Sequence, residues 1–571
     1  MLAPVETRRQ ALETRTGEWR PRSLDQVLDT VAAAHPDRPL VITDDRTYSY
    51  ADLVAWSTRL ARGLVAAGVQ PGDHVAVILA NYPEFVAMTY AVARVGAVTV
   101  PINYLLRRNE LDFVLRQSDA VLLVTMNRFR ALDYLAALDE LAPGWEQAGG
   151  GDVFPRLREV VVFSTNGEQR AGARSLDDLA AAGDDGDGDV RLPGSDPAAT
   201  CDVVYTSGTT GSPKGVLLTH DMLLRTAYAS AYTRAFQDGR RILFSMPLYH
   251  VFGYVEGLLA AVFAGGAIVP QLTFDPVATL AAIEEHRADE VMFVPTMTLA
   301  VLDVARTKTF DLSSLSVVFS SGGQSPAGIW NEIRDLLGAE EIFTAYGMTE
   351  TTASTTCVFP GDPVERLVTT CGRFKPAGVA GDAALGGVLA VYKTVDQVTG
   401  EDLPPGSVGE LVVKGPIVTS GYYGRPDETA AAFDAAGWLR TGDLGRIDDE
   451  GFLTLTGRKK ECYRCGGELV VPKHVEDVLT GYPGVAQAHV VPVPDERMGE
   501  VGVAWVVPEA HAELDAAELL RYCAENLARF KVPIRIFFAE ADDLPVSASG
   551  KIQKFKLVER TKQALQPGRP Q

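Results

Sequence analysis

One stretch of the chain, residues 205–215, combines glycine, hydroxyl and lysine side chains in a pattern suited to binding phosphate. Its closely spaced glycines, Gly208 among them, let backbone N–H groups approach phosphate oxygens. Lys214 adds a mobile point charge suited to a polyphosphate. Further hydrogen-bond donors come from four hydroxyl side chains, Thr206, Ser207, Thr209 and Thr210. Because a strand-like run at residues 202–205 leads into it, the stretch predicts a phosphate-binding loop.

The competing interpretation of this stretch is an exposed turn rich in glycine and hydroxyl residues. Its spacing also differs from the Walker phosphate loop, because the G-x-x-x-x-G-K-[ST] pattern is absent. Eleven consecutive residues of these types nevertheless make a plain surface turn the less favoured interpretation.

The stretch resembles the phosphate-loop signature of the adenylate-forming superfamily, which includes acyl-CoA synthetases, aryl-CoA ligases, luciferases and nonribosomal adenylation domains. Six further motifs of that family follow in the same order, at residues 247–250, 320–323, 346–350, 438–443, 457–461 and 550–554. The resemblance extends over residues 25–560. It implies an α/β fold, with a large N-terminal domain of helix-covered sheets and a small α+β C-terminal domain.

The resemblance implies ATP as a cofactor, and the residue types suit the roles that it assigns. Tyr346 offers a flat face for stacking on adenine, and the turn at Gly323 lies on the adenine side. Asp443 can accept hydrogen bonds from both ribose hydroxyls, while Arg458 supplies a fork of donors beside it. We therefore expect these residues and the phosphate loop to hold the nucleotide.

Four residues are expected to act in catalysis. Glu350 is an oxygen ligand for a Mg²⁺ ion that would bridge triphosphate oxygens, and Thr349 could bond the α-phosphate. Lys551 is the cation expected to stabilise charge on the pentacoordinate α-phosphorus. The attacking carboxylate is already ionised at neutral pH, so no general base is required. His250 borders the acid pocket in the family, but it fits a hydrogen-bonded core histidine equally well.

The pattern of apolar residues changes near residue 460, and this change indicates a domain boundary. We predict an N-terminal domain at residues 1–457, a hinge at residues 458–460 and a mobile C-terminal domain at residues 461–571. Mobility is expected because adenylation needs Lys551, whereas thioester formation needs the strand at Gly466 and Gly467. In the family this strand lines the pantetheine passage, and glycine leaves room for the narrow arm of CoA.

The chain departs from the family pattern beside that passage. Cys465 stands where a basic residue is common, and Leu469 replaces an asparagine. These departures keep two other acceptors open: an acyl carrier protein, or an amine that receives an unusual oxyacid such as nitrite. The pair Cys462 and Cys465 also suggests half a zinc site or a redox pair. No second Cys/His pair at zinc-finger spacing follows, and an alternating strand would separate the two side chains, so this interpretation is disfavoured.

The elements that position these residues alternate between helices and short strands, which favours parallel sheets covered by helices. Helices are predicted at residues 23–34 and 50–67, and strands at residues 74–79, 98–102, 120–125 and 160–164. The apolar run 258–270 predicts a buried helix and strand, and the C-terminal region predicts strands at 486–494 and 502–507 and a helix at 514–527. Exposed loops are predicted at residues 148–152 and 183–190, and an inserted loop at residues 374–400.

Composition limits the class of protein. The net charge of -21 disfavours a broad nucleic-acid surface, and 46% hydrophobic with 22% charged residues is ordinary for a globular chain of 571 residues. Six cysteines do not make a disulfide scaffold. The N-terminal residues lack the apolar core of a signal peptide, and no uninterrupted apolar run of about 18 residues occurs. We expect a cytoplasmic protein without stable membrane insertion, and the sequence does not indicate an oligomeric state.

The predicted reaction activates an acid with ATP to acyl-AMP and pyrophosphate, after which the sulfur of CoA displaces AMP. The segments expected to form the acid pocket, residues 251–254, 294–297 and 351–354, are apolar or small and suit an alkyl or aryl acid. A non-catalytic nucleotide-binding protein is the alternative from a different class. It is disfavoured by the joint presence of Lys214, Glu350, Asp443, Arg458 and Lys551.

Replacing Lys551 by alanine is expected to abolish acyl-AMP formation and to leave the capture of preformed acyl-AMP by CoA measurable. The charge is needed when the α-phosphate is attacked, a step worth about 3–4 kcal/mol by analogy with a lost oxyanion donor. Acid-dependent pyrophosphate exchange measures the first step, and thioester formation from added acyl-AMP measures the second. Normal adenylation by the variant would contradict the role of Lys551.

Overall fold

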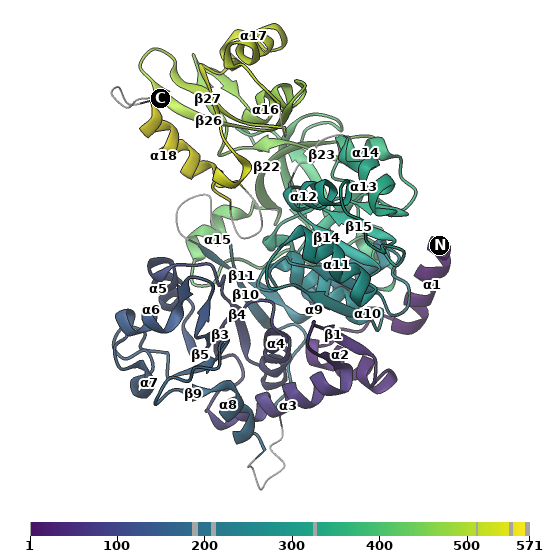
Figure 1. Ribbon diagram of the computed structural model, residues 1–571, viewed down its shortest axis with the longest axis vertical. Helices are drawn as coiled ribbons and strands as arrows, with labels where there is room; N and C mark the ends of the chain where they lie inside the picture. Colours follow the sequence, from purple (N-terminus) through teal and green to yellow (C-terminus); the bar gives the residue numbers. More distant parts are fainter. Residues whose placement is uncertain are drawn as a thin grey trace.

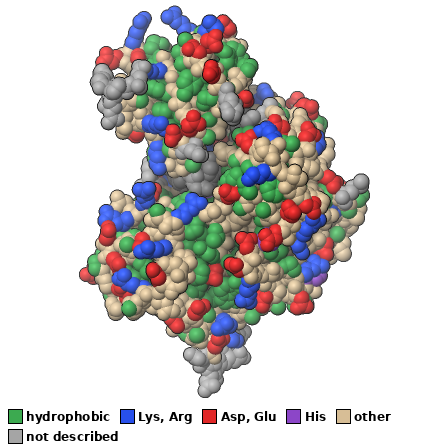
Figure 2. All heavy atoms as spheres, viewed as in Figure 1, with side chains coloured by type: hydrophobic (Ala, Val, Ile, Leu, Met, Phe, Trp, Pro, Cys, Tyr) green, Lys and Arg blue, Asp and Glu red, His purple; other side chains and the backbone are tan. Residues whose placement is uncertain are grey.

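The computed structural model describes residues 2–184, 192–206, 213–323, 328–509, 512–546 and 552–565. A large body holds two seven-stranded sheets, a four-stranded sheet and most of the helices, and a small domain of strands and helices lies at one end of it (Figure 1). Acidic and basic side chains are interspersed over the face drawn in Figure 2, where the small domain meets the large body at a narrowed waist. The predicted α/β fold, with a large N-terminal and a small α+β C-terminal domain, is confirmed.

The first seven-stranded sheet has the spatial order β16-β15-β14-β12-β13-β1-β2. β2 runs antiparallel to β1 at one edge, and the other neighbouring pairs are parallel. The inner strands are buried along their length, as expected of a parallel sheet covered on both faces. The strands are β1 (Pro39–Ile42), β2 (Thr47–Ser49), β12 (Arg241–Phe244), β13 (Ala267–Pro270), β14 (Glu290–Phe293), β15 (Val317–Ser320) and β16 (Glu341–Phe343).

The second seven-stranded sheet has the spatial order β11-β10-β4-β3-β5-β8-β9. Its pairs are parallel except for β10 and β11, which form an antiparallel hairpin at one edge. The strands are β3 (His74–Ile78), β4 (Val98–Pro101), β5 (Ala120–Met126), β8 (Glu159–Phe163), β9 (Arg174–Ser175), β10 (Thr200–Thr206) and β11 (Lys214–Thr219). Each strand predicted in this region is confirmed to within about two residues.

Helices cover these sheets. The helix predicted at residues 50–67 is α3, which begins where the Ser49 hydroxyl accepts a hydrogen bond from the Asp52 N–H. No helix among the described residues is long and apolar enough to cross a bilayer. The helices of the large body are α1 (Val5–Thr16), α2 (Leu24–Ala34), α3 (Tyr50–Ala66), α4 (Pro83–Val95), α5 (Arg108–Gln117), α6 (Tyr134–Leu141), α7 (Trp145–Ala148), α8 (Leu176–Ala182), α9 (His220–Thr233), the π-helix η1 (Phe252–Leu259), α10 (Ala260–Phe263), α11 (Pro276–His286), α12 (Pro295–Ala305), α13 (Ile329–Leu337), α14 (Val364–Thr369) and α15 (Pro426–Ala432).

Smaller sheets complete the large body. Two of them are antiparallel ladders that follow one another along the chain. The first consists of β17 (Ala345–Gly347), β18 (Ser354–Cys357) and β19 (Arg373–Phe374), and the second of β20 (Val391–Val395), β21 (Gly409–Lys414), β22 (Leu439–Ile447) and β23 (Leu453–Arg458). A short hairpin is formed by β6 (Arg128–Phe129) and β7 (Leu132–Asp133).

The C-terminal domain has its own sheet and core. Val490, Val503 and Leu519 are fully buried in that core. Its long hairpin of β26 and β27 and the helix α17 confirm the predicted strands and helix. The elements are β24 (Tyr463–Cys465), β25 (Glu468–Val470), α16 (Pro472–Thr480), β26 (Val485–Asp495), β27 (Gly499–Pro508), α17 (Ala516–Asn526), β28 (Arg535–Phe538) and α18 (Lys554–Ala564).

Two loop predictions are wrong in part. Within residues 148–152, Gly149 and Gly150 are buried, because the chain packs closely on itself there. A Cβ on Gly150 would lie 2.2 Å from the carbonyl oxygen of Phe154. Residues 374–400 are not only loop, since they contain the 3₁₀ turns η3 (Gly378–Ala380) and η4 (Ala383–Leu385) and the strand β20. In the other predicted loop, residues 185–190 lie outside the described residues.

Substituting alanine for Gly63 is expected to destabilise the large body. A Cβ there would lie 2.0 Å from the carbonyl oxygen of Leu179, so α3 and α8 would have to separate. Overpacking of this kind costs about 1–3 kcal/mol, and differential scanning calorimetry should show a lower unfolding temperature. Gly328→Ala is the matched control, because no heavy atom lies within 4 Å of its added Cβ. Equal stability of the two variants would contradict the close approach of the helices.

Candidate functional site

The predicted phosphate loop connects β10 to β11. Thr206 and Lys214 are partners across this hairpin, and the Thr206 hydroxyl donates to the Lys214 carbonyl oxygen over 3.5 Å. The structure therefore places these two predicted residues side by side. The other predicted residues of the loop, Ser207, Gly208, Thr209 and Thr210, lie outside the described residues, as does Lys551.

Lys214 is held by two residues that the sequence motifs did not single out. Its Nζ atom lies 2.6 Å from Glu428 Oε2 on α15 and 4.7 Å from the centre of the Tyr422 ring. The Tyr422 hydroxyl donates to Glu350 Oε1 over 3.0 Å. Tyr422 thus connects the cation of the phosphate loop to the predicted metal ligand.

The chain around Tyr422 docks through its backbone on the hairpin of β10 and β11, called here the phosphate hairpin because it carries the predicted phosphate loop. The Leu217 N–H donates to the Gly421 carbonyl over 3.1 Å, and the Tyr423 N–H donates to the Gly215 carbonyl over 2.8 Å. The Gly-Tyr-Tyr-Gly run at residues 421–424 is the sequence signal that could have indicated this segment, because glycines that flank aromatic residues are typical of a functional turn.

Three predicted nucleotide-binding residues meet at one buried carboxylate. Asp443 is 6% exposed; its Oδ2 accepts from the Tyr346 hydroxyl over 2.7 Å, and its Oδ1 lies 3.0 Å from Arg458 Nε. Asp443 on β22 and Arg458 on β23 are partners across a strand ladder, which positions the pair. Each carboxylate oxygen retains a second lone pair and can still accept a hydrogen bond from a ribose hydroxyl.

Thr349 and Glu350 lie in a strained turn directly after β17. Both are buried in the 3₁₀ turn η2 (Thr349–Thr351), and Thr352 follows with a φ of +68°, which is costly for a β-branched residue. A neighbouring segment holds the turn in place. The Thr352 hydroxyl donates to the Ile417 carbonyl over 2.8 Å, and the Thr419 N–H donates to the Glu350 carbonyl over 2.8 Å.

Gly323 and His250 lie at the ends of two further elements. Gly323 follows β15, where the Ser321 hydroxyl donates to the Ala345 carbonyl over 2.7 Å and so holds this turn beside Tyr346. His250 precedes η1 and is half-buried. The Phe252 backbone N–H donates to its Nδ1 atom over 3.2 Å.

Positive charges converge near the phosphate hairpin. Burial, followed by the charges of Lys214 and Arg458, lowers the pKa of Lys460. The charge of Asp443 is the main cause that raises the pKa of Arg458, and Glu350 adds to it. Lys214, Arg458 and Lys460 therefore share one electrostatic neighbourhood with Glu350, an arrangement suited to a polyphosphate that carries a divalent cation.

The donor set around Glu350 fits Mg²⁺. Glu350 is 8% exposed and belongs to no cluster of three or more metal-ligating side chains within the described part of the chain. A metal held there would draw its remaining ligands from phosphate oxygens and water, which is the usual arrangement for Mg²⁺ at a nucleotide.

The cysteine pair does not form a metal or redox site in the structure. Cys465 packs into the core of the C-terminal domain, whereas the Cys462 sulfur lies 3.2 Å from the Arg458 carbonyl oxygen. Burial, helped by Glu461, raises the pKa of Cys462 to about 11, so its thiol is protonated at neutral pH.

Gly466 and Gly467 form the turn between β24 and β25, with φ of +60° and +87°. Among the described residues, the backbone hydrogen bonds of this turn stay within its own domain: the Gly466 N–H donates to the Met498 carbonyl, and Arg464 Nη1 donates to the Gly467 carbonyl. The structure does not join this turn to the cluster at Asp443 through any of these bonds.

Comparison with known proteins matches the chain to two family models: AMP-binding enzyme over residues 28–423, and AMP-binding enzyme C-terminal domain over residues 474–551. A putative acyl-CoA synthetase, YngI of Bacillus subtilis, is 34% identical over 94% of this chain and 97% of its own length. A feruloyl-CoA synthase of Amycolatopsis is 35% identical over 89% of this chain and 92% of its own length. The crystal structure of ATP-bound MatB from Rhodopseudomonas palustris superposes with a TM-score of 0.80 at 27% identity, covering 95% of this chain and 100% of that one.

Replacing Asp443 by asparagine is expected to weaken ATP binding about tenfold to a hundredfold. A hydrogen bond to a charged group is worth about 1.5–3 kcal/mol, and the change also removes the charge that faces Arg458. Isothermal titration with ATP measures the effect. Glu450→Gln is the matched control, since that carboxylate is exposed and pairs with Arg366 away from the cluster. Unchanged ATP affinity in the Asp443 variant would exclude it from the nucleotide site.

Proposed function

This chain belongs to the AMP-binding enzyme family, and we propose that the cluster of Tyr346, Asp443 and Arg458 binds the adenosine half of its ATP. It is an acid–CoA ligase, which activates an acid as its acyl-adenylate and then forms the CoA thioester. The observation that carries the assignment of the site is the buried Asp443 carboxylate, whose two oxygens face Tyr346 and Arg458. A buried carboxylate with lone pairs left over is well suited to accept hydrogen bonds from ribose hydroxyls.

In the first half-reaction, a carboxylate oxygen of the acid attacks the α-phosphorus, and the bond to pyrophosphate breaks. The residues of this chain bind and orient the triphosphate. We assign Lys214 and the phosphate loop to its β and γ groups, and Thr349 and Lys551 to its α group. To do so, Lys214 must exchange its contact with Glu428 for the phosphate, which costs little because that pair is partly solvated.

We propose Glu350 as the residue that holds the Mg²⁺ ion. When bound, the ion neutralises charge on the triphosphate oxygens and helps pyrophosphate to leave. The Tyr422 hydroxyl donates a hydrogen bond to Glu350 and thereby orients the carboxylate.

In the second half-reaction, the CoA sulfur attacks the carbonyl carbon of the acyl-adenylate, and AMP leaves. We propose that the C-terminal domain, residues 461–571, turns about residues 458–460 so that the turn at Gly466 and Gly467 reaches this centre. The four-stranded sheet that carries Asp443 ends with β23 at Arg458, and the sheet of the C-terminal domain begins with β24 at Tyr463. A short connection of this kind suits a hinge.

The acid is proposed to be an alkyl or aryl carboxylic acid. The segments predicted to line its pocket contain buried apolar side chains, among them Val251, Val294 and Ala353. Pockets of this kind favour apolar substrates with few polar anchors. The similarity to a feruloyl-CoA synthase agrees with an aryl acid.

A cytoplasmic location is part of the proposal. All six cysteines are free thiols, which agrees with a reducing compartment.

The choice of CoA as acceptor is tested with a substitution in the predicted passage. Gly467→Leu should reduce thioester formation at least about tenfold and spare pyrophosphate release, because bulk is added to the CoA passage and not to the ATP site. Both products are measured with the same acid.

Gly406→Leu is the control for backbone strain. Its φ of +79° is close to the +87° of Gly467, and an added Cβ meets nothing within 4 Å at either position. Normal transfer to CoA by Gly467→Leu would show that the passage lies elsewhere. If acyl-AMP formed in place reacts with a carrier protein or an amine but not with CoA, the acceptor assignment is wrong.

A further inference from the structure

Thr352 has a strained backbone two residues after the predicted metal ligand Glu350. Its φ is +68° and its ψ is -30°. The left-handed region that L residues can adopt has a ψ of about +30° to +60°, so this conformation lies outside it. Five residues other than glycine have a positive φ in the described part of the chain, and only Thr352 among them is β-branched. Strain of this kind persists only where the surrounding structure enforces it.

One side of the strained turn is held by the segment at residues 417–419. The Thr352 hydroxyl donates to the Ile417 carbonyl oxygen over 2.8 Å, and the Glu350 carbonyl accepts from the Thr419 N–H over 2.8 Å. Thr352 is fully buried, so water does not compete for its hydroxyl.

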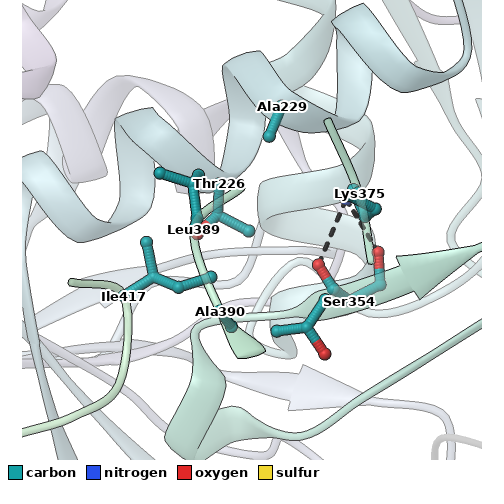
Figure 3. A pocket seen from close by; sticks show the side chains of 8 residues that line it. Thr226, Ala229, Ser354, Lys375, Leu389, Ala390 and Ile417 are labelled. Carbon is teal, nitrogen blue, oxygen red and sulfur yellow. Dashed lines mark hydrogen bonds between the residues drawn. The ribbon is translucent and has the colours of Figure 1, made fainter. Parts of the chain in front are cut away.

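The other side is held at Ser354 by a buried ion pair, Glu256 and Lys375. The Ser354 N–H donates to Glu256 Oε1 over 3.0 Å. Lys375 Nζ donates to Ser354 twice, over 2.9 Å to its hydroxyl and 3.1 Å to its carbonyl, as Figure 3 shows. The two charged residues are 1% and 4% exposed, and Lys375 Nζ lies 3.4 Å from Glu256 Oε1.

The pair is a firm anchor because its charges are compensated within the protein. Burial raises the pKa of Glu256, but the charges of Lys375 and Arg234 outweigh it, so the net pKa is lowered and the carboxylate is ionised. Hydrogen bonds to an ionised group are stronger than those between neutral groups. Ser354, where β18 begins, is therefore fixed four residues after Glu350.

These contacts fix both ends of a short stretch that contains Thr352. The Glu350 carbonyl is held at its start and the Ser354 N–H at its end. A change of Thr352 to an ordinary negative φ would turn the chain the other way, so both bonds could not persist. The conformation of Thr352 thereby determines the direction in which the Glu350 side chain leaves the backbone, toward the Tyr422 hydroxyl 3.0 Å away.

We propose that Thr352 is a positioning residue that holds the Glu350 carboxylate in the direction needed for Mg²⁺, an inference that rests on the proposed role of Glu350. Thr352 acts through Glu350. Its strained backbone is enforced by Ile417 on one side and by Ser354 with its ion pair on the other, and it keeps Glu350 oriented before the nucleotide binds. Partners that orient a metal ligand are typically worth about tenfold to a hundredfold in metal affinity.

The test compares Thr352→Gly with Thr89→Gly. Glycine adopts a positive φ without strain, so the first variant removes both the strain and the hydroxyl that hold the turn. Thr89 is the matched control, because it is 2% exposed and its hydroxyl donates to the Phe85 carbonyl over 2.9 Å, but it lies in the ordinary helical backbone of α4. The same side-chain atoms are therefore removed from a buried position away from the turn.

Binding is measured by calorimetry with an ATP analogue that has a methylene group between the α- and β-phosphorus, with and without Mg²⁺. Thr352→Gly should weaken binding of the magnesium complex at least about tenfold and leave metal-free binding unchanged. The Mg²⁺ concentration that half-saturates acid-dependent pyrophosphate exchange should rise to the same extent. Thr352→Ser, which keeps the hydroxyl on Ile417, should behave like the unmodified protein.

The unfolding temperature separates positioning from a merely structural role. Thr352→Gly loses a buried side chain but is relieved of strain, so it should lower the unfolding temperature less than Thr89→Gly does. Thr89→Gly should nevertheless leave the Mg²⁺ dependence unchanged. The opposite order of the two unfolding temperatures would overturn the strain on which the inference depends.

Glu350→Gln distinguishes a failure of this inference from a failure of the proposed function. If Glu350→Gln raises the Mg²⁺ requirement and a folded Thr352→Gly does not, the positioning role of Thr352 is overturned. If Glu350→Gln leaves the requirement unchanged, the proposed metal site itself is overturned, and the inference with it. Should Thr352→Gly fail to fold, Thr352→Asn decides in the same assays, because asparagine tolerates a positive φ and lacks the hydroxyl. An unchanged Mg²⁺ dependence in that variant would equally overturn the role of Thr352.

Discussion

The site depends on one buried charge, the Asp443 carboxylate. A carboxylate that is 6% exposed is stable only when its oxygens are paired, and here the partners come from β17, through Tyr346, and from β23, through Arg458. Both strands must be in place before Asp443 can be buried. The interaction therefore couples the assembly of the cluster of Tyr346, Asp443 and Arg458 to the strand that leads into the C-terminal domain.

The protein uses charged side chains in two different ways. Around Lys214, Arg458 and Lys460, positive charges are gathered in one place and attract anions. Burial, followed by the charges of Lys214 and Arg458, lowers the pKa of Lys460 there. Around Glu256 and Lys375, the charges are paired and their hydrogen bonds are satisfied within the protein. The first arrangement is suited to binding a charged substrate, whereas the second joins η1 to β18 inside the large body.

The departures from the family pattern in the C-terminal domain have a partial explanation in packing. Cys465 stands where a basic residue is common, and its side chain is 5% exposed in the core of that domain. A cysteine fits such a position as a small apolar residue, whereas a lysine or arginine would need a path to solvent. Leu469 is 40% exposed on β25, and nothing in the structure explains why it replaces a polar residue.

The sequence by itself determined the fold class and most strands of the second seven-stranded sheet, because alternation, caps and glycine spacing are local properties of the chain. Of the first seven-stranded sheet it indicated only the strand β13, and its assignment of nucleotide-binding residues stays a prediction. It could not show that Tyr422 connects Lys214 to Glu350, since these residues lie far apart along the chain and meet only when the segment at residues 421–424 docks on β11. Sequence reasoning likewise did not identify Glu256 and Lys375 as a pair. A single charged residue is usually solvated, and the sequence does not show which one is buried against a distant opposite charge. Tertiary structure decided these pairings because burial and long-range contact are set by how the elements pack, and not by residue type.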